Sequence, residues 1–213
     1  MGSEDKITRL LLSGAKRNPK RIIYAEADHL DVLKAAQIVY DEGIGKPILL
    51  GRRELILELM NEIEFDATNV QIIDPKSEKQ RQQREEYAEL LWKKKSRKGI
   101  TLFDAKKLIR ERNYFAAMML EKGDADAMLS GYSRAYPAVL KPILELIGKE
   151  KGVEKVAATN LMNTAKGPIF ISDTSINIEP SANELANIAI MTARTVKMFG
   201  IEPNAAMVSY SNF

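Results

Sequence analysis

The stretch RIIYAEADHLDVLKAAQIVYDEGIGKPILLG, residues 21–51, decides the fold class. It begins with a short apolar run, continues with apolar residues at helical spacing over residues 31–41, and ends with a second apolar run. A further helical pattern at 53–63 and a third apolar run at 70–74 follow. The alternation of strand and helix predicts right-handed βαβ units and an α/β fold with a parallel sheet. Strands that are continuously apolar fit a sheet covered by helices on both faces.

A fourth strand is predicted within residues 123–134. Gly123 ends the helix expected over residues 114–122, a short strand follows, and the chain then opens into a loop at Ser130 and Gly131. Ligands of open α/β sheets bind where strands end at their carboxyl side, and glycine lets the backbone approach an anion closely. The same pattern is also typical of an ordinary strand-to-helix turn. Both interpretations fit these residues.

The amino-acid composition argues against several classes of partner: nucleic acids, metal ions and membranes. The 213 residues are 45% hydrophobic and 29% charged, as in ordinary globular proteins, and the net charge of +3 is too small to indicate a nucleic-acid partner. Without cysteine, and with a single histidine, the chain offers no metal-ligand spacing. No apolar run approaches the roughly 18 residues that span a membrane, and the N-terminus lacks the apolar core of a signal peptide. We therefore expect a cytoplasmic protein with no metal site, membrane partner or nucleic-acid partner.

Three local patterns permit chemistry and also have structural explanations. The basic run at residues 93–98 suits phosphate, and it equally suits the negative end of a helix, which is the interpretation we favour. His29 could act as a general base, but we interpret its neighbour Asp28 as a helix cap. Asp173, Asn177 and Glu179 form an acidic, amide-bearing loop after a strand, and we interpret them as turn residues before Pro180. Glycine motifs for dinucleotides and P-loops and the nucleophile elbow are missing, which leaves an α/β protein with scope for an anionic ligand.

The last third of the chain predicts a change of architecture. Runs at residues 156–158 and 169–171 look like paired strands joined by a polar connection, and the glycines around residues 148–152 suggest a hinge. We therefore predict a first α/β domain over residues 1–147 and the start of a second, truncated domain over residues 148–213.

Two helix starts carry clear signals. Thr101 with Asp104, and Ser181 with Glu184, have the spacing of a capping box. A last strand is predicted over residues 205–208, followed by a strand-exit loop at the C-terminus.

Several segments together resemble the phosphate acetyl/butyryltransferase family, in order along nearly the whole chain. They are Arg97-Lys98-Gly99-Ile100-Thr101, residues 123–131, Ile171-Ser172-Asp173 with Asn177 and Pro180, Glu184-Leu185-Ala186, and residues 207–213. Within the family, residues 199–203 and the closing Ser-Tyr-Ser-Asn-Phe are most similar to the transacetylase-like C-terminal domain of large bacterial NADP-dependent malic enzymes.

The resemblance implies a three-layer α/β/α fold of the two-domain type found in isocitrate and isopropylmalate dehydrogenases, with the second domain incomplete here. It also implies a ligand in the cleft between the domains, and self-association into a homo-oligomer. The residues expected to bind acyl-CoA or phosphate are Ser130, Gly131, Ser133, Arg134, Lys141, Arg97, Lys98, Thr159 and Asn160. No catalytic residue is assigned.

This sequence departs from the transacetylase pattern at two places. Transacetylases tend to continue the Ser130 loop with a Ser-Thr pair and then Arg-Pro, whereas Ala135-Tyr136 and Lys141-Pro142 stand here. Replacing a bidentate guanidinium by a point charge weakens acyl-phosphate chemistry more than binding of a polyanionic CoA tail. The catalytic segment of the family lies beyond Phe213 in this comparison.

Two functions follow from the resemblance. The first is an acyl-CoA-sensing regulatory domain joined to the catalytic domain of a malic enzyme, where NADP and a divalent metal bind outside this chain. The alternative is a phosphate acetyltransferase, which passes an acyl group between CoA and phosphate. A nucleic-acid binder that uses residues 93–98 is the least favoured hypothesis.

Overall fold

The computed structural model describes residues 3–66 and 68–208. The chain forms two compact units: one is built from residues 12–148, and the other from the described residues up to Leu11 together with those from Lys149 onward. The domain limits expected from the sequence, 1–147 and 148–213, stay a prediction. The closing Ser-Tyr-Ser-Asn-Phe segment lies outside the described residues.

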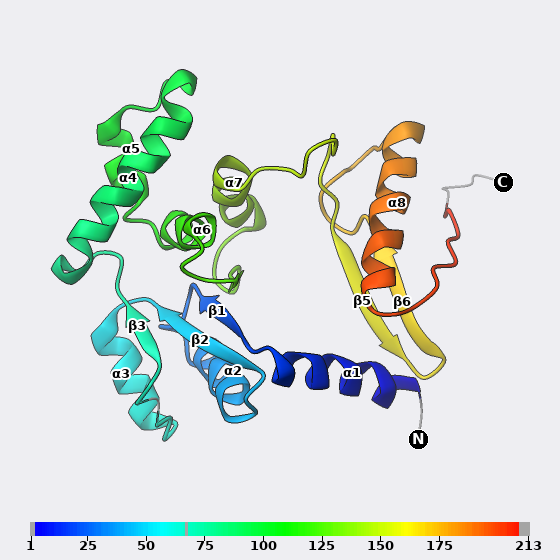
Figure 1. Cartoon of the computed structure of the whole chain (residues 1–213), viewed down its shortest axis with the longest axis horizontal. Helices are drawn as coiled ribbons and strands as arrows, with labels where there is room; N and C mark the ends of the chain where they lie inside the picture. Colours follow the sequence, from blue (N-terminus) through cyan, green and yellow to red (C-terminus); the bar gives the residue numbers. More distant parts are fainter. Residues whose placement is uncertain (1–2, 67, 209–213) are drawn as a thin grey trace. The chain divides into compact units, whose positions relative to one another are not determined.

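A four-stranded parallel sheet forms the centre of the larger unit (Figure 1). The strands lie in the order β3-β2-β1-β4, and β1 pairs with both β2 and β4, so that Ile23 lies between Ile48 and Met128. The sheet confirms the predicted α/β class. Its strands are β1 (Lys20–Tyr24), β2 (Gly45–Leu50), β3 (Gln71–Ile73) and β4 (Ala127–Leu129).

Helices connect the strands and cover both faces of the sheet (Figure 1). The helix α1 (Ser3–Arg17) precedes β1. The connections between the first three strands are α2 (Leu30–Asp41) and α3 (Arg53–Glu62). The chain then runs through several helices before and after β4, which are α4 (Arg81–Lys95), α5 (Leu102–Leu108), α6 (Arg112–Lys122) and α7 (Tyr136–Leu146), with short 3-10 helices η1 (Glu78–Gln80) and η2 (Ser96–Lys98) beside α4.

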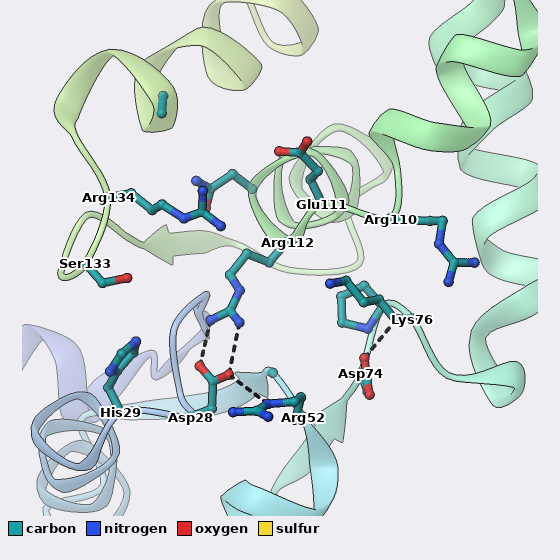
Figure 2. Close-up of a pocket in the computed structure, with 14 residues that line it drawn as sticks. Asp28, His29, Arg52, Asp74, Lys76, Arg110, Glu111, Arg112, Ser133 and Arg134 are labelled. Atoms are coloured by element: carbon teal, nitrogen blue, oxygen red, sulfur yellow. Dashed lines mark hydrogen bonds and ion pairs between the residues drawn. The ribbon is translucent and has the colours of Figure 1, made fainter.

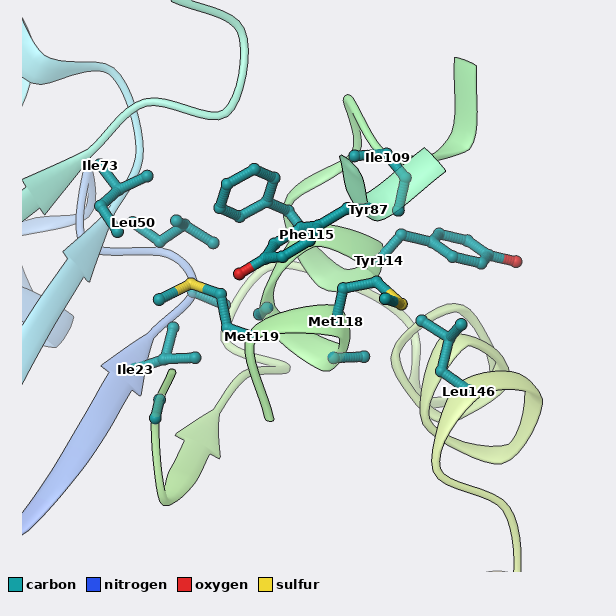
Figure 3. Close-up of a cluster of buried hydrophobic side chains, with 14 of the residues drawn as sticks. Ile23, Leu50, Ile73, Tyr87, Ile109, Tyr114, Phe115, Met118, Met119 and Leu146 are labelled. Carbon is teal, nitrogen blue, oxygen red and sulfur yellow. The ribbon is translucent and has the colours of Figure 1, made fainter. Parts of the chain in front are cut away.

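The sheet separates two hydrophobic cores, which makes three layers. Successive residues of one strand point to opposite faces, so Ile23 belongs to one core and Tyr24 to the other. Figure 3 shows the first core, in which Phe115 and Met119 of α6 lie toward the sheet and Met118 lies toward Leu146 of α7. Met118 and Met119 are both buried. The second core lies between the sheet and the helices α2 and α3.

Local signals mark the ends of several helices where they were predicted. Gly123 ends α6 in the left-handed conformation, with φ of 76°, which only glycine adopts without strain. Thr101 and Asp104 form a complete capping box at the start of α5, and Ser181 and Glu184 form another at the start of α8 (Ala182–Met198). These predictions are confirmed.

The smaller unit contains an antiparallel hairpin and α8. The hairpin strands are β5 (Thr159–Thr164) and β6 (Gly167–Ser172). The predicted strand at residues 156–158 is therefore wrong, because pairing begins at Thr159 and a two-residue turn replaces the longer polar connection. Thr164 Oγ1 donates to the carbonyl of Gly167 at 2.6 Å and closes that turn. Most of β5 is exposed, so the strand contains polar residues and lacks the apolar run from which a strand would be predicted.

The predicted last strand at residues 205–208 is also wrong. In the described part of the chain these residues form no strand, because no neighbouring strand pairs with them. An apolar run becomes a strand only where another strand can accept its hydrogen bonds.

Candidate functional site

A cleft of about 700 Å³ opens at the carboxyl ends of the strands in the larger unit (Figure 2). Each of the four strands contributes the loop that follows it, and the start of α6 forms another part of the wall. Ligands of parallel α/β sheets bind at this edge. The lining residues are Asp28, His29, Gly51, Arg52, Asp74, Pro75, Lys76, Arg110, Glu111, Arg112, Asn113, Ser133, Arg134 and Ala138.

Asp28 and Arg112 form a bidentate ion pair in the cleft wall. The two guanidinium nitrogens of Arg112 lie 2.6 and 2.9 Å from the carboxylate oxygens of Asp28, whose side chain is only 6% exposed. Arg52 approaches the same carboxylate at 3.9 Å (Figure 2). Burial raises the pKa of Asp28, but the hydrogen bonds and charge of Arg112 outweigh it and hold this pKa below its ordinary value. Asp28 is therefore charged and already paired.

The interpretation of Asp28 as a helix cap is wrong. The residue in the cap position of α2 is His29, whose side chain makes no capping hydrogen bond. The ring of His29 lies against Tyr132, with 5.2 Å between the ring centroids, and Tyr132 donates to Asp31 at 2.6 Å. Because Asp28 accepts from Arg112 instead, it does not orient the imidazole for general-base chemistry.

Cationic side chains outnumber carboxylates in the cleft. Five cations line it against Asp28, Asp74 and Glu111, and Arg112 is already neutralised by Asp28. Within the described part of the chain, Lys76, Arg110 and Arg134 have side chains with no ion pair or hydrogen bond. They come from three different loops and border one cavity (Figure 2). This arrangement suits a ligand with several negative charges.

The loop after β4 donates its backbone hydrogen bonds to an internal carboxylate. Glu26 Oε2 accepts from the backbone N–H groups of Gly131 at 2.8 Å and Tyr132 at 2.7 Å, and Oε1 accepts from that of Ser133 at 3.0 Å. The hydroxyl of Ser133 also donates to Oε1. Burial raises the pKa of Glu26, but these hydrogen bonds outweigh it and leave the pKa below its ordinary value. Glu26 is 1% exposed.

The structure separates the predicted binding residues into groups. Ser133 and Arg134 line the cleft; Ser130 lies next to it and donates to Asn113 Oδ1 at 2.8 Å, and Gly131 donates to Glu26. Lys141, on the exposed surface of α7, is not among the lining residues, and neither are Arg97 and Lys98 of η2. Thr159 and Asn160 belong to β5 in the other unit, where the Thr159 hydroxyl lies 3.0 Å from that of Ser172. The part of all nine predicted residues in binding acyl-CoA or phosphate stays a prediction.

The basic run at residues 93–98 has structural partners. Lys94 pairs with Glu121 and donates to the carbonyl of Leu146 at 2.8 Å, so it joins α4 to α6 and α7. Burial and then the charge of Lys98 lower the pKa of Lys95. These contacts support the favoured interpretation of a helix end.

Sequence reasoning missed Glu26, Arg52, Lys76, Arg110, Arg112 and Asn113. For Arg52 and Lys76 a signal existed, since each follows a predicted strand by a few residues, as Asp28 does. The residues that follow the four strands make up more than half of the residues that line the cleft.

Two classes of site or segment are absent from the described residues. No group of three or more histidine or acidic residues lies close enough there to hold a metal ion. No helix in residues 3–66 and 68–208 has the length and apolar character needed to cross a membrane.

Solved structures share this fold. A phosphotransacetylase from Streptococcus pyogenes superposes with a TM-score of 0.82 at 33% identity, over 95% of this chain and 62% of that one. The EutD phosphotransacetylase from Staphylococcus aureus gives a TM-score of 0.84 over 95% of this chain and 60% of that one. At 24% identity it shows the fold alone.

Curated relatives have two kinds of name. A phosphate acetyltransferase from Thermoanaerobacterium thermosaccharolyticum is 36% identical over 96% of this chain and 63% of its own. An NADP-dependent malic enzyme from Haemophilus influenzae is 36% identical over 96% of this chain, but only 27% of its own length is covered. The chain thus spans less than two thirds of each of these relatives.

A family model settles the relationship that the fold and these relatives indicate. The model for phosphate acetyl/butaryl transferase matches residues 6–213, nearly the whole sequence. The chain therefore belongs to the phosphate acetyl/butaryl transferase family.

Proposed function

We propose that this transacetylase-like chain binds acyl-CoA and serves as a regulatory domain of a multidomain NADP-dependent malic enzyme. The observation that carries the proposal is the cleft with its free cations Lys76, Arg110 and Arg134. The CoA tail is a polyanion, and guanidinium and ammonium groups are the side chains that recognise phosphate. In the parent enzyme, NADP and a divalent metal bind in the malic domain, and the assembly is a cytoplasmic homo-oligomer.

The Ser130 loop supports sensing rather than catalysis. Acyl transfer to phosphate needs donors that are free to meet the charge that develops in the transition state. The backbone donors of Gly131, Tyr132 and Ser133 are already bonded to Glu26. His29, the single histidine, has no carboxylate partner among the described residues that would orient it as a base. A pocket that binds the CoA tail without these tools acts as a receptor.

The alternative function is phosphate acetyltransferase. The observation that favours it is the 36% identity to the phosphate acetyltransferase from Thermoanaerobacterium thermosaccharolyticum, of which the chain covers 63%. In that case the general base comes from sequence outside these 213 residues.

Calorimetric titration of the full-length parent protein with acetyl-CoA tests the proposal. We expect Arg110→Ala to weaken binding about tenfold, a factor that corresponds to ~1.4 kcal/mol for one lost charge-assisted contact. Arg53→Ala is the matched control, because Arg53 is an exposed cation of α3 that does not line the cleft. It should bind acetyl-CoA as the wild-type protein does.

Two activity measurements on the same protein separate the functions. If acetyl-CoA changes the rate of malate decarboxylation and no acetyl phosphate forms in the presence of phosphate, the regulatory function is supported. Steady formation of acetyl phosphate would establish the alternative. Absence of any heat of binding with acetyl-CoA or CoA would overturn both.

A further inference from the structure

We propose that Glu26 is a positioning residue, whose carboxylate occupies an anion-binding loop and thereby holds Ser133 and Arg134 at the wall of the cleft. The inference deepens the proposed function and rests on it for the ligand. The inference rests on the contact between the loop after β1, which contains Glu26, and the loop after β4, which contains Gly131 and Ser133.

Three consecutive backbone N–H groups converge on this one carboxylate. Such a concave set of donors is a known way for a backbone to bind an anion. Gly131 has a φ of 108°, a backbone conformation that residues other than glycine rarely adopt. This conformation lets the loop curve around the carboxylate of Glu26. The loop residues themselves are exposed, whereas Glu26 is buried. The anion that fills this binding loop therefore comes from the protein itself.

No side-chain cation shares in this contact. In the described residues Glu26 accepts hydrogen bonds only from the loop, and the guanidinium of Arg112, whose pKa the charge of Glu26 helps to raise, is bonded to Asp28. A buried carboxylate costs several kcal/mol unless hydrogen bonds compensate it. Four donors from the loop supply that compensation, so loop and carboxylate stabilise each other and neither is stable alone in this conformation.

The position in the sheet gives the contact its functional meaning. From β1 the chain first builds the sheet toward β3 and later returns to add β4 on the other side of β1. The crevice between the ends of β1 and β4 is where the strand order reverses, the usual ligand position of such sheets. Glu26 fills this crevice, and Ser133 is bound to it through both its N–H and its hydroxyl.

The neighbouring residue depends on this contact. Arg134 follows Ser133 directly and has no hydrogen bond of its own in the described part of the chain, yet it lines the cleft (Figure 2). Among the described residues, this loop has three further side-chain contacts: the hydrogen bonds from Ser130 to Asn113 and from Tyr132 to Asp31, and the contact of the Tyr132 ring with His29. We therefore expect the phosphates of the ligand to meet side chains, Arg134 among them, rather than backbone N–H groups of this loop.

Removal of the carboxylate gives a direct test. In the full-length parent protein, Glu26→Ala leaves the loop donors without an acceptor, and we expect acetyl-CoA to bind about tenfold more weakly. Formate, a small carboxylate that fits the vacated position, should restore the affinity, while chloride at equal ionic strength should not. A purely structural loss would not respond to formate.

The matched control is Asp126→Ala. Asp126 is also a carboxylate that accepts several hydrogen bonds, from the backbone N–H of Arg21 at 2.8 Å and from its guanidinium at 2.9 and 3.2 Å. Asp126 directly precedes β4 and so lies at the amino ends of the parallel strands, whereas the cleft lies at their carboxyl ends. Asp126→Ala should lower the melting temperature, leave the affinity for acetyl-CoA unchanged, and show no response to formate.

Amide hydrogen exchange provides a readout without acetyl-CoA. In the wild-type protein the N–H groups of residues 131–133 should exchange slowly although the loop is exposed; they should exchange fast in Glu26→Ala and slowly again with formate. If acetyl-CoA never binds the wild type but this pattern appears, the proposed function fails and the anion-binding loop stands. A folded Glu26→Ala protein with wild-type exchange and affinity would overturn the inference.

A second variant covers the case in which Glu26→Ala does not fold. Glu26→Gln keeps the shape and one acceptor oxygen, but places an NH₂ group against the donors of Gly131 and Tyr132 or of Ser133. We expect a folded protein with weaker acetyl-CoA binding and faster exchange in the loop. Wild-type behaviour of this variant would equally overturn the inference.

Discussion

Glu26 and Asp28 follow the same strand, and both are committed to partners inside the protein. Glu26 binds the backbone of residues 131–133, whereas Asp28 binds the guanidinium of Arg112. Gly51 leaves room for Asp28, because a Cβ atom at this position would lie 3.2 Å from the Asp28 side chain and would push against it. At the scale of single residues, the carboxylates of Glu26 and Asp28 therefore hold the loops of the cleft in place. Cations that pair with neither carboxylate, Lys76, Arg110 and Arg134, line the cavity.

The pair of Asp28 and Arg112 predicts a large loss of stability when one partner is removed. Arg112→Leu leaves a nearly buried carboxylate without its bidentate partner, and we expect the free energy of unfolding to fall by about 3 kcal/mol. Urea denaturation measures the change. Arg81→Leu is the control, since Arg81 and Glu78 form an exposed pair at 3.2 Å. That variant should lose less than about 1 kcal/mol. Equal losses in both variants would contradict the role of burial.

At the scale of helices and strands, local signals predicted most elements because their causes are local. Helical spacing, Gly123 and the two capping boxes each act within a few residues, and all appear in the structure. The exceptions are β5 and residues 205–208, for which the partner strand decides the outcome. Pairing depends on residues distant in sequence, so composition alone misplaced these two segments.

The capping box of α5 gives a prediction for this element. Thr101 Oγ1 accepts from the N–H of Asp104 at 3.1 Å, and Asp104 accepts from the N–H of Thr101 at the same distance. Thr101→Ala should lower the free energy of unfolding by about 1 kcal/mol, the typical value for a lost cap. Ser96→Ala is the control, because the Ser96 hydroxyl has no hydrogen-bond partner among the described residues. A similar loss in both variants would show that the cap contributes nothing.

Across the whole molecule, the sequence predicted the sheet but only part of the site. Ser133 and Arg134 were identified from one loop, while Arg52, Lys76 and Arg110 come from three other loops. The parallel arrangement of the strands brings Arg52 and Lys76 to the same ends of the sheet, and the connection between α5 and α6 adds Arg110. The role of Glu26 was not predicted, because its partner Gly131 lies 105 residues later in the sequence.

Acid stability is the prediction that belongs to the whole molecule. The carboxyl groups of the described residues with a clearly shifted pKa all have it lowered, to about 2 at Asp126 through hydrogen bonds from Arg21. At Asp173, burial raises the pKa, but N–H groups of Ala158, Ser175 and Asn177 outweigh it and bring it to about 2. Such groups stabilise the fold fully above their ordinary pKa, near 4, and this contribution disappears as the pH falls to about 2.

We therefore expect the melting temperature to fall steeply between about pH 4 and pH 2. Circular dichroism at a series of pH values measures it. Asp173→Asn should show a shallower fall over this interval, since one of the linked groups no longer titrates. A melting temperature that stays constant or rises on acidification would contradict the lowered pKa values.

The late arrival of β4 has a consequence for synthesis of the chain on the ribosome. In the finished sheet β1 is bordered by β2 and β4, but β4 begins only at Ala127, after α4, α5 and α6. Until then the nascent sheet ends at the five residues of β1, whereas the finished sheet ends at the three residues of β4, and a shorter edge offers fewer unpaired backbone groups to other chains. The nascent chain is therefore more prone to aggregation before Ala127–Leu129 leaves the ribosomal exit tunnel than after it.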